Sequence, residues 1–261
     1  MKKRINNLKK KFKKYGIDGY VIPKNNDYFT EYSKINRLKI ISNFSGSAGL
    51  AVILKNKNYL FTDGRYTIQS EIESGKNFKI LSYEKIINCK LFKNLKLGLD
   101  PKLFTYEQIK KYFLSQNQVK FISNNLIDEI KIDKISNDTP FFSLKDEIVG
   151  ENKRSKIHKI VNYLKKKGAD NLFITAPENV AWILNIRGND VPNSPIPNCR
   201  LIINKSKKIF LITEPKKAKI LIKKKIINKN QLININDLQK KIFLINGKNF
   251  IIDNKSCSVF Y

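Results

Sequence analysis

The sequence predicts an α/β fold made of two similar domains in tandem. Three observations support it: a length of 261 residues, an amphipathic helix followed by a buried strand that occurs twice, and a β-hairpin after each occurrence. A chain of this length can bury two cores of ordinary size. The two occurrences lie about 150 residues apart, which is the size of a domain, so duplication of a domain explains them better than a solenoid of short repeats.

The first occurrence begins at the N-terminus. Apolar residues recur at spacings of three and four over residues 2–15, which predicts an amphipathic helix with its lysines on the outer face. These apolar residues are Ile5, Leu8, Phe12 and Tyr15. Gly16 is predicted to end the helix, and the short apolar run of residues 17–23, closed by Pro23, predicts a buried strand.

The second occurrence follows the same plan. An apolar stripe predicts a helix that ends at residues 165–167, and Gly168 then leads into a predicted strand at residues 172–174. The stripe consists of Ile157, Ile160, Val161 and Leu164. Gly168 therefore corresponds to Gly16 of the first occurrence.

A β-hairpin is predicted after each helix and strand. In the first copy, the strands are residues 51–54 and 59–61. In the second copy, they are residues 201–203 and 209–212. Each hairpin encloses a short polar turn, as expected for two antiparallel strands.

Further elements follow the hairpins. Helices are predicted over residues 66–74 in the first copy and 216–225 in the second. Near the end of the chain, residues 249–253 and 257–261 are apolar and are predicted to be strand-like. Because no polar tail follows them, we expect the second domain to be truncated at its C-terminal end.

A polar, charged segment without periodicity separates the two copies at residues 146–154. We place the boundary near residue 148. The first predicted domain therefore covers residues 1–148, and the second covers residues 149–261.

The charge balance is strongly basic. With 51 Lys and Arg against 22 Asp and Glu, the net charge is +29, which attracts phosphates and other anionic surfaces. The basic residues are nearly all lysines, spread along the whole chain together with many Asn and Ile. This distribution favours compositional drift on solvated surfaces over a nucleic-acid interface, because fold constrains surface charge only weakly.

The cysteines and the apolar segments indicate a cytoplasmic protein without a membrane span. Cys89, Cys199 and Cys257 are odd in number and far apart, with no CxxC spacing, which indicates neither a disulfide framework nor a zinc site. The N-terminus is charged without an apolar core, and no run of 18 apolar residues occurs.

Residues for hydrolytic metal chemistry are scarce. A hydrolytic metal centre needs several His, Asp, Glu or Cys ligands around the ion, usually with at least one imidazole. The sequence has one histidine, His158, without an HxxxH or HExxH partner, and we expect it to be structural. The sequence therefore indicates no metal ligand and no catalytic residue in this chain.

The segment of residues 45–49, Ser-Gly-Ser-Ala-Gly, resembles a nucleophile turn only superficially. It lacks the full GxSxG spacing and precedes a strand rather than a helix. We expect its small residues to serve a tight turn and a close approach of the backbone to neighbouring groups.

Two charged pairs are candidate recognition residues. Asp63 and Arg65 flank Gly64, and Arg187 and Asp190 lie in an Arg-Gly-Asn-Asp-Val-Pro segment. Each Asp can accept backbone N–H bonds and each Arg can bind a carboxylate with two bonds. Two interpretations follow, a loop-stabilising ion pair and recognition of a peptide terminus on the substrate side. The residue pattern alone favours the first.

Several ordered motifs together resemble the Xaa-Pro aminopeptidase (aminopeptidase P) family of the creatinase and methionine-aminopeptidase superfamily. Along the chain they are residues 16–23 (GIDGYVIP), 43–49 (NFSGSAG), 62–69 (TDGRYTIQ), 97–101 (LGLDP), 125–128 (NLID) and 181–192 (AWILNIRGNDVP). Motifs in this order cover nearly the whole sequence.

The resemblance implies two tandem creatinase-N-terminal-like domains, each a mixed β-sheet flanked by helices. In the family, a C-terminal "pita-bread" domain follows and holds a dinuclear metal centre, typically manganese, which activates water to cleave the bond before proline. That domain is absent from this sequence. We therefore expect the chain to be inactive alone and to hold no cofactor itself.

The resemblance also implies a role and partners. The N-terminal domains of such enzymes shape the substrate entrance and support assembly, so the expected partners are the missing catalytic domain, a peptide with proline at its second position, and a second copy in a homodimer. As a hypothesis, Arg187 and Asp190 face the catalytic domain. Two alternatives remain open: a basic nucleic-acid-binding protein, whose binding would weaken steeply with salt, and a stand-alone interaction module derived from the peptidase scaffold.

Overall fold

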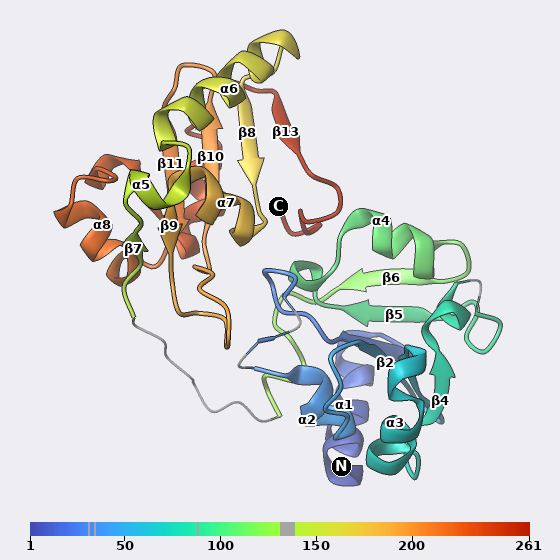
Figure 1. Cartoon of the computed structure of the whole chain (residues 1–261). Helices are drawn as coiled ribbons and strands as arrows, with labels where there is room; N and C mark the ends of the chain where they lie inside the picture. Colours follow the sequence, from blue (N-terminus) through green and yellow to red (C-terminus); the bar gives the residue numbers. More distant parts are fainter. Residues whose placement is uncertain (31, 34, 88, 131–138) are drawn as a thin grey trace. The chain divides into compact units, whose positions relative to one another are not determined.

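A computed structural model of the chain consists of two compact units (Figure 1). Unit 1 comprises residues 1–135 and Ser258–Phe260, and unit 2 comprises residues 136–257 and Tyr261. The structure describes residues 1–30, 32–33, 35–87, 89–130 and 139–261.

Unit 1 is built on a mixed β-sheet with the strand order β4-β3-β2-β1-β5-β6. Its strands are β1 (Gly19–Pro23), β2 (Gly49–Leu54), β3 (Asn58–Thr62), β4 (Lys79–Ser82), β5 (Lys96–Leu99) and β6 (Gln118–Phe121). The pairs β1–β2 and β2–β3 are antiparallel, and the other neighbours are parallel. Its helices are α1 (Lys2–Tyr15), α2 (Arg37–Ser42), α3 (Thr67–Ser74) and α4 (Tyr106–Ile109), the last continuing into the π-helical turn η4 (Lys110–Leu114).

The core of unit 1 lies on both faces of this sheet. On one face, Leu8 and Phe12 of α1 and Ile41 of α2 pack in a buried cluster with alternate residues of β1 and β2. On the other face, Ile109 and Phe113 of α4 and η4 join a second buried cluster with residues of β2, β3 and β5. Because successive side chains of a strand point to opposite faces, continuously apolar strands such as β1 and β2 serve both clusters.

Unit 2 repeats this architecture with the strand order β12-β11-β10-β8-β13. Its sheet strands are β8 (Asn171–Ile174), β10 (Arg200–Asn204), β11 (Ile209–Thr213), β12 (Leu232–Asn234) and β13 (Phe250–Ile252). A separate antiparallel ribbon joins β7 (Phe142–Ser143) and β9 (Ile186–Arg187). Its helices are α5 (Asp146–Val149), α6 (Lys153–Lys166), α7 (Pro177–Leu184), α8 (Lys219–Lys223) and α9 (Leu238–Ile242).

The predicted duplication is confirmed by the pairing of the strands. The pairings among β8, β10, β11, β12 and β13 have the same order and the same parallel or antiparallel senses as those among β1 to β5, while β6 has no counterpart among the described strands of unit 2. Gly16 and Gly168, predicted to correspond, follow the ends of α1 and α6 with φ of 56° and 64°. Glycine suits this left-handed conformation because it has no Cβ atom to clash with the backbone. The predicted α/β fold with two similar domains is therefore correct.

Residues 139–148 pack with unit 2, although the boundary expected from the sequence lies near residue 148. Phe141 is buried in a core cluster of unit 2, and Phe142 and Ser143 pair with β9. The polar composition that follows at residues 146–154 marks the surface of α5 and the start of α6, both of which belong to unit 2.

The expected strand at residues 257–261 is wrong. These residues form turns and one isolated bridge, between Ser258 and Thr105. Their apolar side chains are used in packing: Val259 packs against the second core cluster of unit 1, and the ring of Tyr261 lies edge-on to Phe173 of unit 2 at 5.5 Å.

Candidate functional site

Asp63 and Arg65 form an ion pair with each other on the surface of unit 1. Asp63 precedes the 3-10 turn η1 (Gly64–Tyr66), and its Oδ1 accepts from the backbone N–H of Arg65 at 3.0 Å. The guanidinium of Arg65 donates to both carboxylate oxygens, with Nη2 to Oδ2 at 2.7 Å. The hydrogen bonds from Arg65 lower the pKa of Asp63. This geometry stabilises the turn that leads into α3.

Arg187 ends β9 and binds main-chain carbonyls. Its Nη1 donates to the carbonyl oxygens of Ile186 at 2.9 Å and Ala181 at 3.3 Å, which fixes the guanidinium beside the end of α7. These are the hydrogen bonds that its guanidinium makes within the described ranges, so Nη2 and Nε keep donors for a further acceptor.

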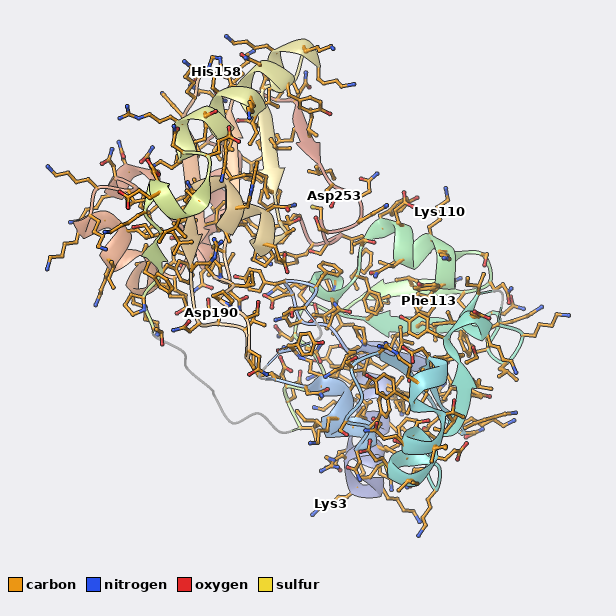
Figure 2. All side chains as sticks on the ribbon, viewed as in Figure 1. Lys3, Lys110, Phe113, His158, Asp190 and Asp253 are labelled. Atoms are coloured by element: carbon orange, nitrogen blue, oxygen red, sulfur yellow. The ribbon has the colours of Figure 1, made fainter. Side chains whose placement is uncertain are left out.

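Asp190 lies in a buried ion pair with Lys217. The Nζ of Lys217 donates to Oδ1 of Asp190 at 2.6 Å, and the two side chains are 9% and 1% exposed. The second carboxylate oxygen accepts from the backbone N–H of Asn198 at 2.7 Å. Lys217 belongs to the 3-10 turn η5 (Pro215–Ala218), and its ammonium also lies 5.7 Å from the ring centre of Phe141. The pair thus ties together three loops of unit 2, and Figure 2 labels Asp190 in its loop.

The sequence pattern did not reveal Lys217 as the partner of Asp190. A lysine in a Pro-Lys-Lys run is usually a solvated residue, and only the tertiary fold brings it to the carboxylate. Asp63 and Arg65 are brought together as expected of a loop-stabilising pair. A substrate-side role for these four residues stays a prediction.

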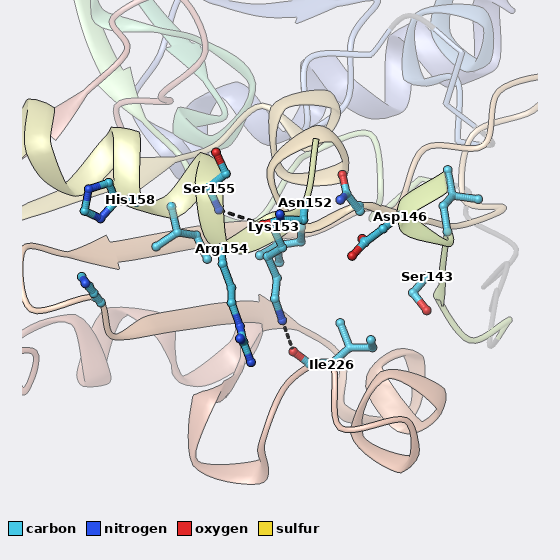
Figure 3. A pocket seen from close by; sticks show the side chains of 13 residues that line it. Ser143, Asp146, Asn152, Lys153, Arg154, Ser155, His158 and Ile226 are labelled. Carbon is cyan, nitrogen blue, oxygen red and sulfur yellow. Dashed lines mark hydrogen bonds between the residues drawn. The ribbon is translucent and has the colours of Figure 1, made fainter. Parts of the chain in front are cut away.

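His158 lies on α6 beside a groove of about 910 Å³ in unit 2 (Figure 3). Lys153 and Arg154 line the same groove, together with Asp146 and Lys207. Lys153 is held at the wall, because its Nζ donates to the carbonyl of Ile226 at 2.6 Å. The positive charges of Lys153, Arg154 and Lys207 make this groove an unfavourable place for a divalent metal ion.

Ser47 and Ala48 form a bend before β2 rather than the expected tight turn, whereas the expected close approach of the backbone to neighbouring groups is found at Gly46. A Cβ atom on Gly46 would lie 2.3 Å from Cζ of Phe44, so only glycine fits without displacing the ring. Ser45 donates its backbone N–H and its hydroxyl to the carboxylate of Glu73, at 2.7 and 2.6 Å. Burial raises the pKa of Glu73, but the hydrogen bonds from Ser45 and Gln69 outweigh it and the pKa is lowered overall. Ser45 and its neighbours are thus structural.

A buried lysine was missed by the sequence analysis. Lys156 of α6 is 2% exposed, and its Nζ donates to the carbonyl of Trp182 and to Oδ1 of Asn185, both at 2.7 Å. The ammonium also lies 4.2 Å from the ring centre of Trp182. Asn185 has a φ of 54° and ends α7, so this lysine fixes the end of that helix. Lys156 lies four residues before Ile160, at the spacing that places both on one face of the helix, and this was its signal in the sequence.

Groups that could hold a metal ion are absent from the part of the chain that the structure describes, where no three His, Cys, Asp or Glu side chains come together. The residues described do not fit a dinuclear metal centre.

The three cysteines are free thiols in buried positions. Burial raises the pKa of Cys199 and of Cys257, as expected for inert core thiols. Among the described helices, none combines the length and the apolar character needed to cross a membrane.

Two family models match the chain in succession. One, described as the creatinase/prolidase N-terminal domain, matches residues 4–130, and another with the same description matches residues 132–261. The chain belongs to the creatinase/prolidase N-terminal domain family. Its two creatinase/prolidase N-terminal domains coincide with the duplicated sheets of unit 1 and unit 2.

Similar curated proteins carry these tandem creatinase/prolidase N-terminal domains within longer chains. Xaa-Pro aminopeptidase 1 of Dictyostelium discoideum is 30% identical over 238 residues, which cover 82% of this chain and 38% of that protein. Aminopeptidase P2 of Arabidopsis thaliana is 32% identical over 207 residues, which cover 72% of this chain and 29% of that protein. The chain thus spans less than two fifths of the length of these two relatives.

A solved structure shares the fold over both creatinase/prolidase N-terminal domains. It is an X-prolyl aminopeptidase from Caenorhabditis elegans, described as a cytosolic enzyme with a di-nuclear active site. The two chains are 23% identical with a TM-score of 0.80, over 92% of this chain and 43% of that one. At this identity the likeness establishes the fold.

Proposed function

We propose that this chain is the N-terminal, non-catalytic region of a metal-dependent Xaa-Pro aminopeptidase, a cytoplasmic hydrolase that removes the residue before proline from the N-terminus of peptides. The observation that carries the proposal is the alignment of both domains with the N-terminal part of curated Xaa-Pro aminopeptidases, over 82% of the chain for the Dictyostelium protein. The dinuclear manganese centre belongs, in this proposal, to the polypeptide that follows this region in the relatives. Substrate and homodimer contacts are properties of that complete enzyme.

The contribution of this chain is to shape the substrate entrance. Arg187 supports this role, because its Nη2 and Nε donors stay available within the described ranges while Nη1 is anchored on two carbonyls. An anchored guanidinium can bind a carboxylate or carbonyl of a peptide at little further entropic cost. Asp190 holds the loop that follows Arg187 through its ion pair with Lys217.

Complementation tests the proposal. The purified chain is assayed for release of the first amino acid from an Xaa-Pro peptide with manganese, alone and mixed with the remaining C-terminal part of the Dictyostelium relative. We expect no release by the chain alone and release by the mixture above that of the C-terminal part by itself. Release by the pure chain, or no gain on mixing, would contradict the proposal.

A variant separates the role of Arg187 from folding. Arg187→Ala in the mixture should lower kcat/KM about tenfold, the loss expected for one charge-assisted hydrogen bond to substrate. Arg154→Ala, an exposed arginine of α6, is the matched control and should leave kcat/KM unchanged. Unchanged kcat and KM for Arg187→Ala would remove this residue from the proposal.

A further inference from the structure

The groove beside α6 in unit 2 has an excess of positive charge. Three cations, Lys153, Arg154 and Lys207, line it together with one acid, Asp146. Glu151, the acid just before α6, does not line the groove and is already in an ion pair at 2.8 Å. The lining therefore keeps two positive charges that no lining acid balances.

Lys153 is held beside Arg154 in spite of their like charges. The Nζ of Lys153 donates to the carbonyl oxygen of Ile226 at 2.6 Å, and Figure 3 shows both cationic side chains extending from the start of α6 toward the segment of Ile226. Burial, followed by the positive charge of Arg154, lowers the pKa of Lys153, whereas the carboxylate of Asp146 acts in the opposite direction. An anion placed between the two cations would replace this repulsion by attraction.

The other two cations have donors to spare. Among the described residues, neither Arg154 nor Lys207 makes a side-chain hydrogen bond or an ion pair, and both are exposed. Lys207 lies in the turn between β10 and β11, where its backbone N–H donates to the carbonyl of Asn204 at 2.9 Å. Two separate elements, the start of α6 and a closed hairpin turn, thus present cationic donors to one groove.

The rest of the lining is largely apolar. Leu184 is buried in the core cluster of unit 2, and Ile157 and Ile226 pack against that cluster, so the apolar part of the groove is a fixed surface of the core. The volume of about 910 Å³ is in the range of sites that bind small molecules. A ligand with an apolar body and an anionic group therefore matches both kinds of lining residue.

The amount of charge favours a phosphate as the anionic group. A phosphate monoester carries about −1.5 to −2 charges at neutral pH, which balances the excess of two, whereas one carboxylate balances half of it. Its oxygens can also accept hydrogen bonds from an ammonium and a guanidinium at the same time.

We propose that this groove is a binding site for a small organic phosphate, a phosphate monoester with an apolar body. Its phosphate is bound by Lys153, Arg154 and Lys207, and its body packs on Ile157 and Ile226. The proposal goes beyond the proposed function and does not depend on it, because cleavage of a peptide neither uses nor releases a phosphate ester. No such ester is present in the peptidase assay either.

Calorimetric titration of the full chain with naphthyl phosphate tests the site. The titration is done without added metal ions at an ionic strength of about 0.15 M, which screens the diffuse attraction of the other lysines. We expect one saturable site per chain. Inorganic phosphate, which lacks the apolar body, and naphthoate, which carries one charge, should each bind at least about tenfold more weakly.

A pair of lysine variants separates this site from the overall charge. Lys207→Met removes one cation from the groove and should weaken the binding of naphthyl phosphate at least about tenfold. Lys166→Met removes the same charge from an exposed position of α6 that does not line the groove, and it should bind like the native chain. Both lysines are exposed, so both variants should keep the native Tm.

Three results would overturn the proposal: no saturable binding of naphthyl phosphate, equal affinity for inorganic phosphate, or equal binding by Lys207→Met and Lys166→Met. The first would leave no site, the second would leave no role for the apolar lining, and the third would trace binding to diffuse charge. If naphthyl phosphate does not bind while complementation restores peptidase activity, the phosphate site fails and the proposed function stands. If naphthyl phosphate binds and activity is not restored, the reverse holds.

Discussion

Asp18 of unit 1 and Asp170 of unit 2 hold equivalent positions and bind equivalent groups. Oδ1 of Asp18 binds Nζ of Lys55 at 2.8 Å, and its Oδ2 accepts from the backbone N–H of Lys96 at 3.0 Å. Asp170 binds Nζ of Lys205 at 2.6 Å and accepts from the N–H groups of Lys248 and Asn249. In each unit, one carboxylate just after the long helix, α1 or α6, is bonded to the turn of the hairpin and to the start of the late parallel strand.

Acid should destabilise the chain through these carboxylates. The hydrogen bonds from Lys205, then those from Asn249 and Lys248, lower the pKa of Asp170 from 3.8 to about 2. A carboxylate whose pKa is lower in the folded state stabilises fully above its unfolded pKa, and this contribution is lost as the pH falls through the folded value. We expect Asp170→Asn to lower Tm at neutral pH, and the difference from the native chain to shrink between pH 3.8 and about 2.

Asp18→Asn should act in the same direction, since hydrogen bonds from Lys55 and Lys96 lower the pKa of Asp18. Thermal unfolding followed by circular dichroism measures both variants. A difference in Tm that stays constant across this pH range would show that the carboxylate charge is not responsible.

The buried and exposed ion pairs should differ in their contribution to stability. Lys217→Met removes the ammonium from an ion pair whose side chains are 9% and 1% exposed, which should lower the free energy of unfolding by about 3 kcal/mol. Arg65→Ala, in the exposed pair with Asp63, should lower it by less than about 1 kcal/mol. Urea unfolding measures both variants, and equal losses would contradict the burial of the first pair.

Lys156 should contribute more to stability than the other lysines of α6. Lys156→Ala removes two hydrogen bonds and the contact with the ring of Trp182, so we expect a loss of about 2 kcal/mol. Lys166→Ala, an exposed lysine on the same helix, should change stability by less than about 0.5 kcal/mol. Trp182 is the single tryptophan of the sequence, so its fluorescence reports unfolding of this unit directly. Similar losses for both variants would show that Lys156 is not the anchor of α7.

Two glycines of unit 1 provide a matched pair. Gly46→Ala places a methyl group 2.3 Å from Phe44, which should lower the free energy of unfolding by about 2 kcal/mol. Gly64 has nothing within 4 Å of such a methyl group, so Gly64→Ala should stay within about 0.5 kcal/mol of the native chain. Chemical denaturation distinguishes them, and an unchanged free energy of unfolding for Gly46→Ala would mean that residues 45–49 are not tightly packed.

The net charge of +29 permits a test of the nucleic-acid alternative. Lysines dispersed over both units give only a diffuse attraction to phosphates, which salt screens. We expect a fluorescent DNA duplex to be bound weakly at low salt and released at an ionic strength of about 0.15 M. Binding that persists at this ionic strength would favour the alternative.

The sequence predicted the elements with strong local patterns. The stripe of Ile5, Leu8 and Phe12 marked α1 because a helix that covers a sheet must bury one face, and the structure buries all three. Both hairpins were found because long apolar runs enclose short polar turns. β4, β5, β6 and β12 were missed, since strands of three or four residues that pair in parallel carry no turn signal of their own, and so were the two-residue strands β7 and β9. α2 and α7 were also missed. Both helices are short, and each ends at an asparagine with positive φ rather than at the glycine that usually marks a helix end.

The candidate site was less predictable for a related reason. Asp63 and Arg65 lie two residues apart, so their pairing follows from local geometry. Asp190 and Lys217 are separated by 27 residues, and Lys156 lies 29 residues from Asn185, so only the folded sheet and helices bring these groups together. The composition predicted lysines on solvated surfaces. Lys156 and Lys217 are buried instead, because the tertiary structure brings them to buried acceptors.

The central position of β1 bears on how the chain folds during synthesis. β1 pairs with β2 soon after it in the sequence and with β5 much later, so the sheet of unit 1 closes only after β5 has been made. All of its strands nevertheless lie before residue 122. Since domains fold as units and the N-terminal one folds first, unit 1 can form its sheet on the ribosome while the strands of unit 2 are still being translated.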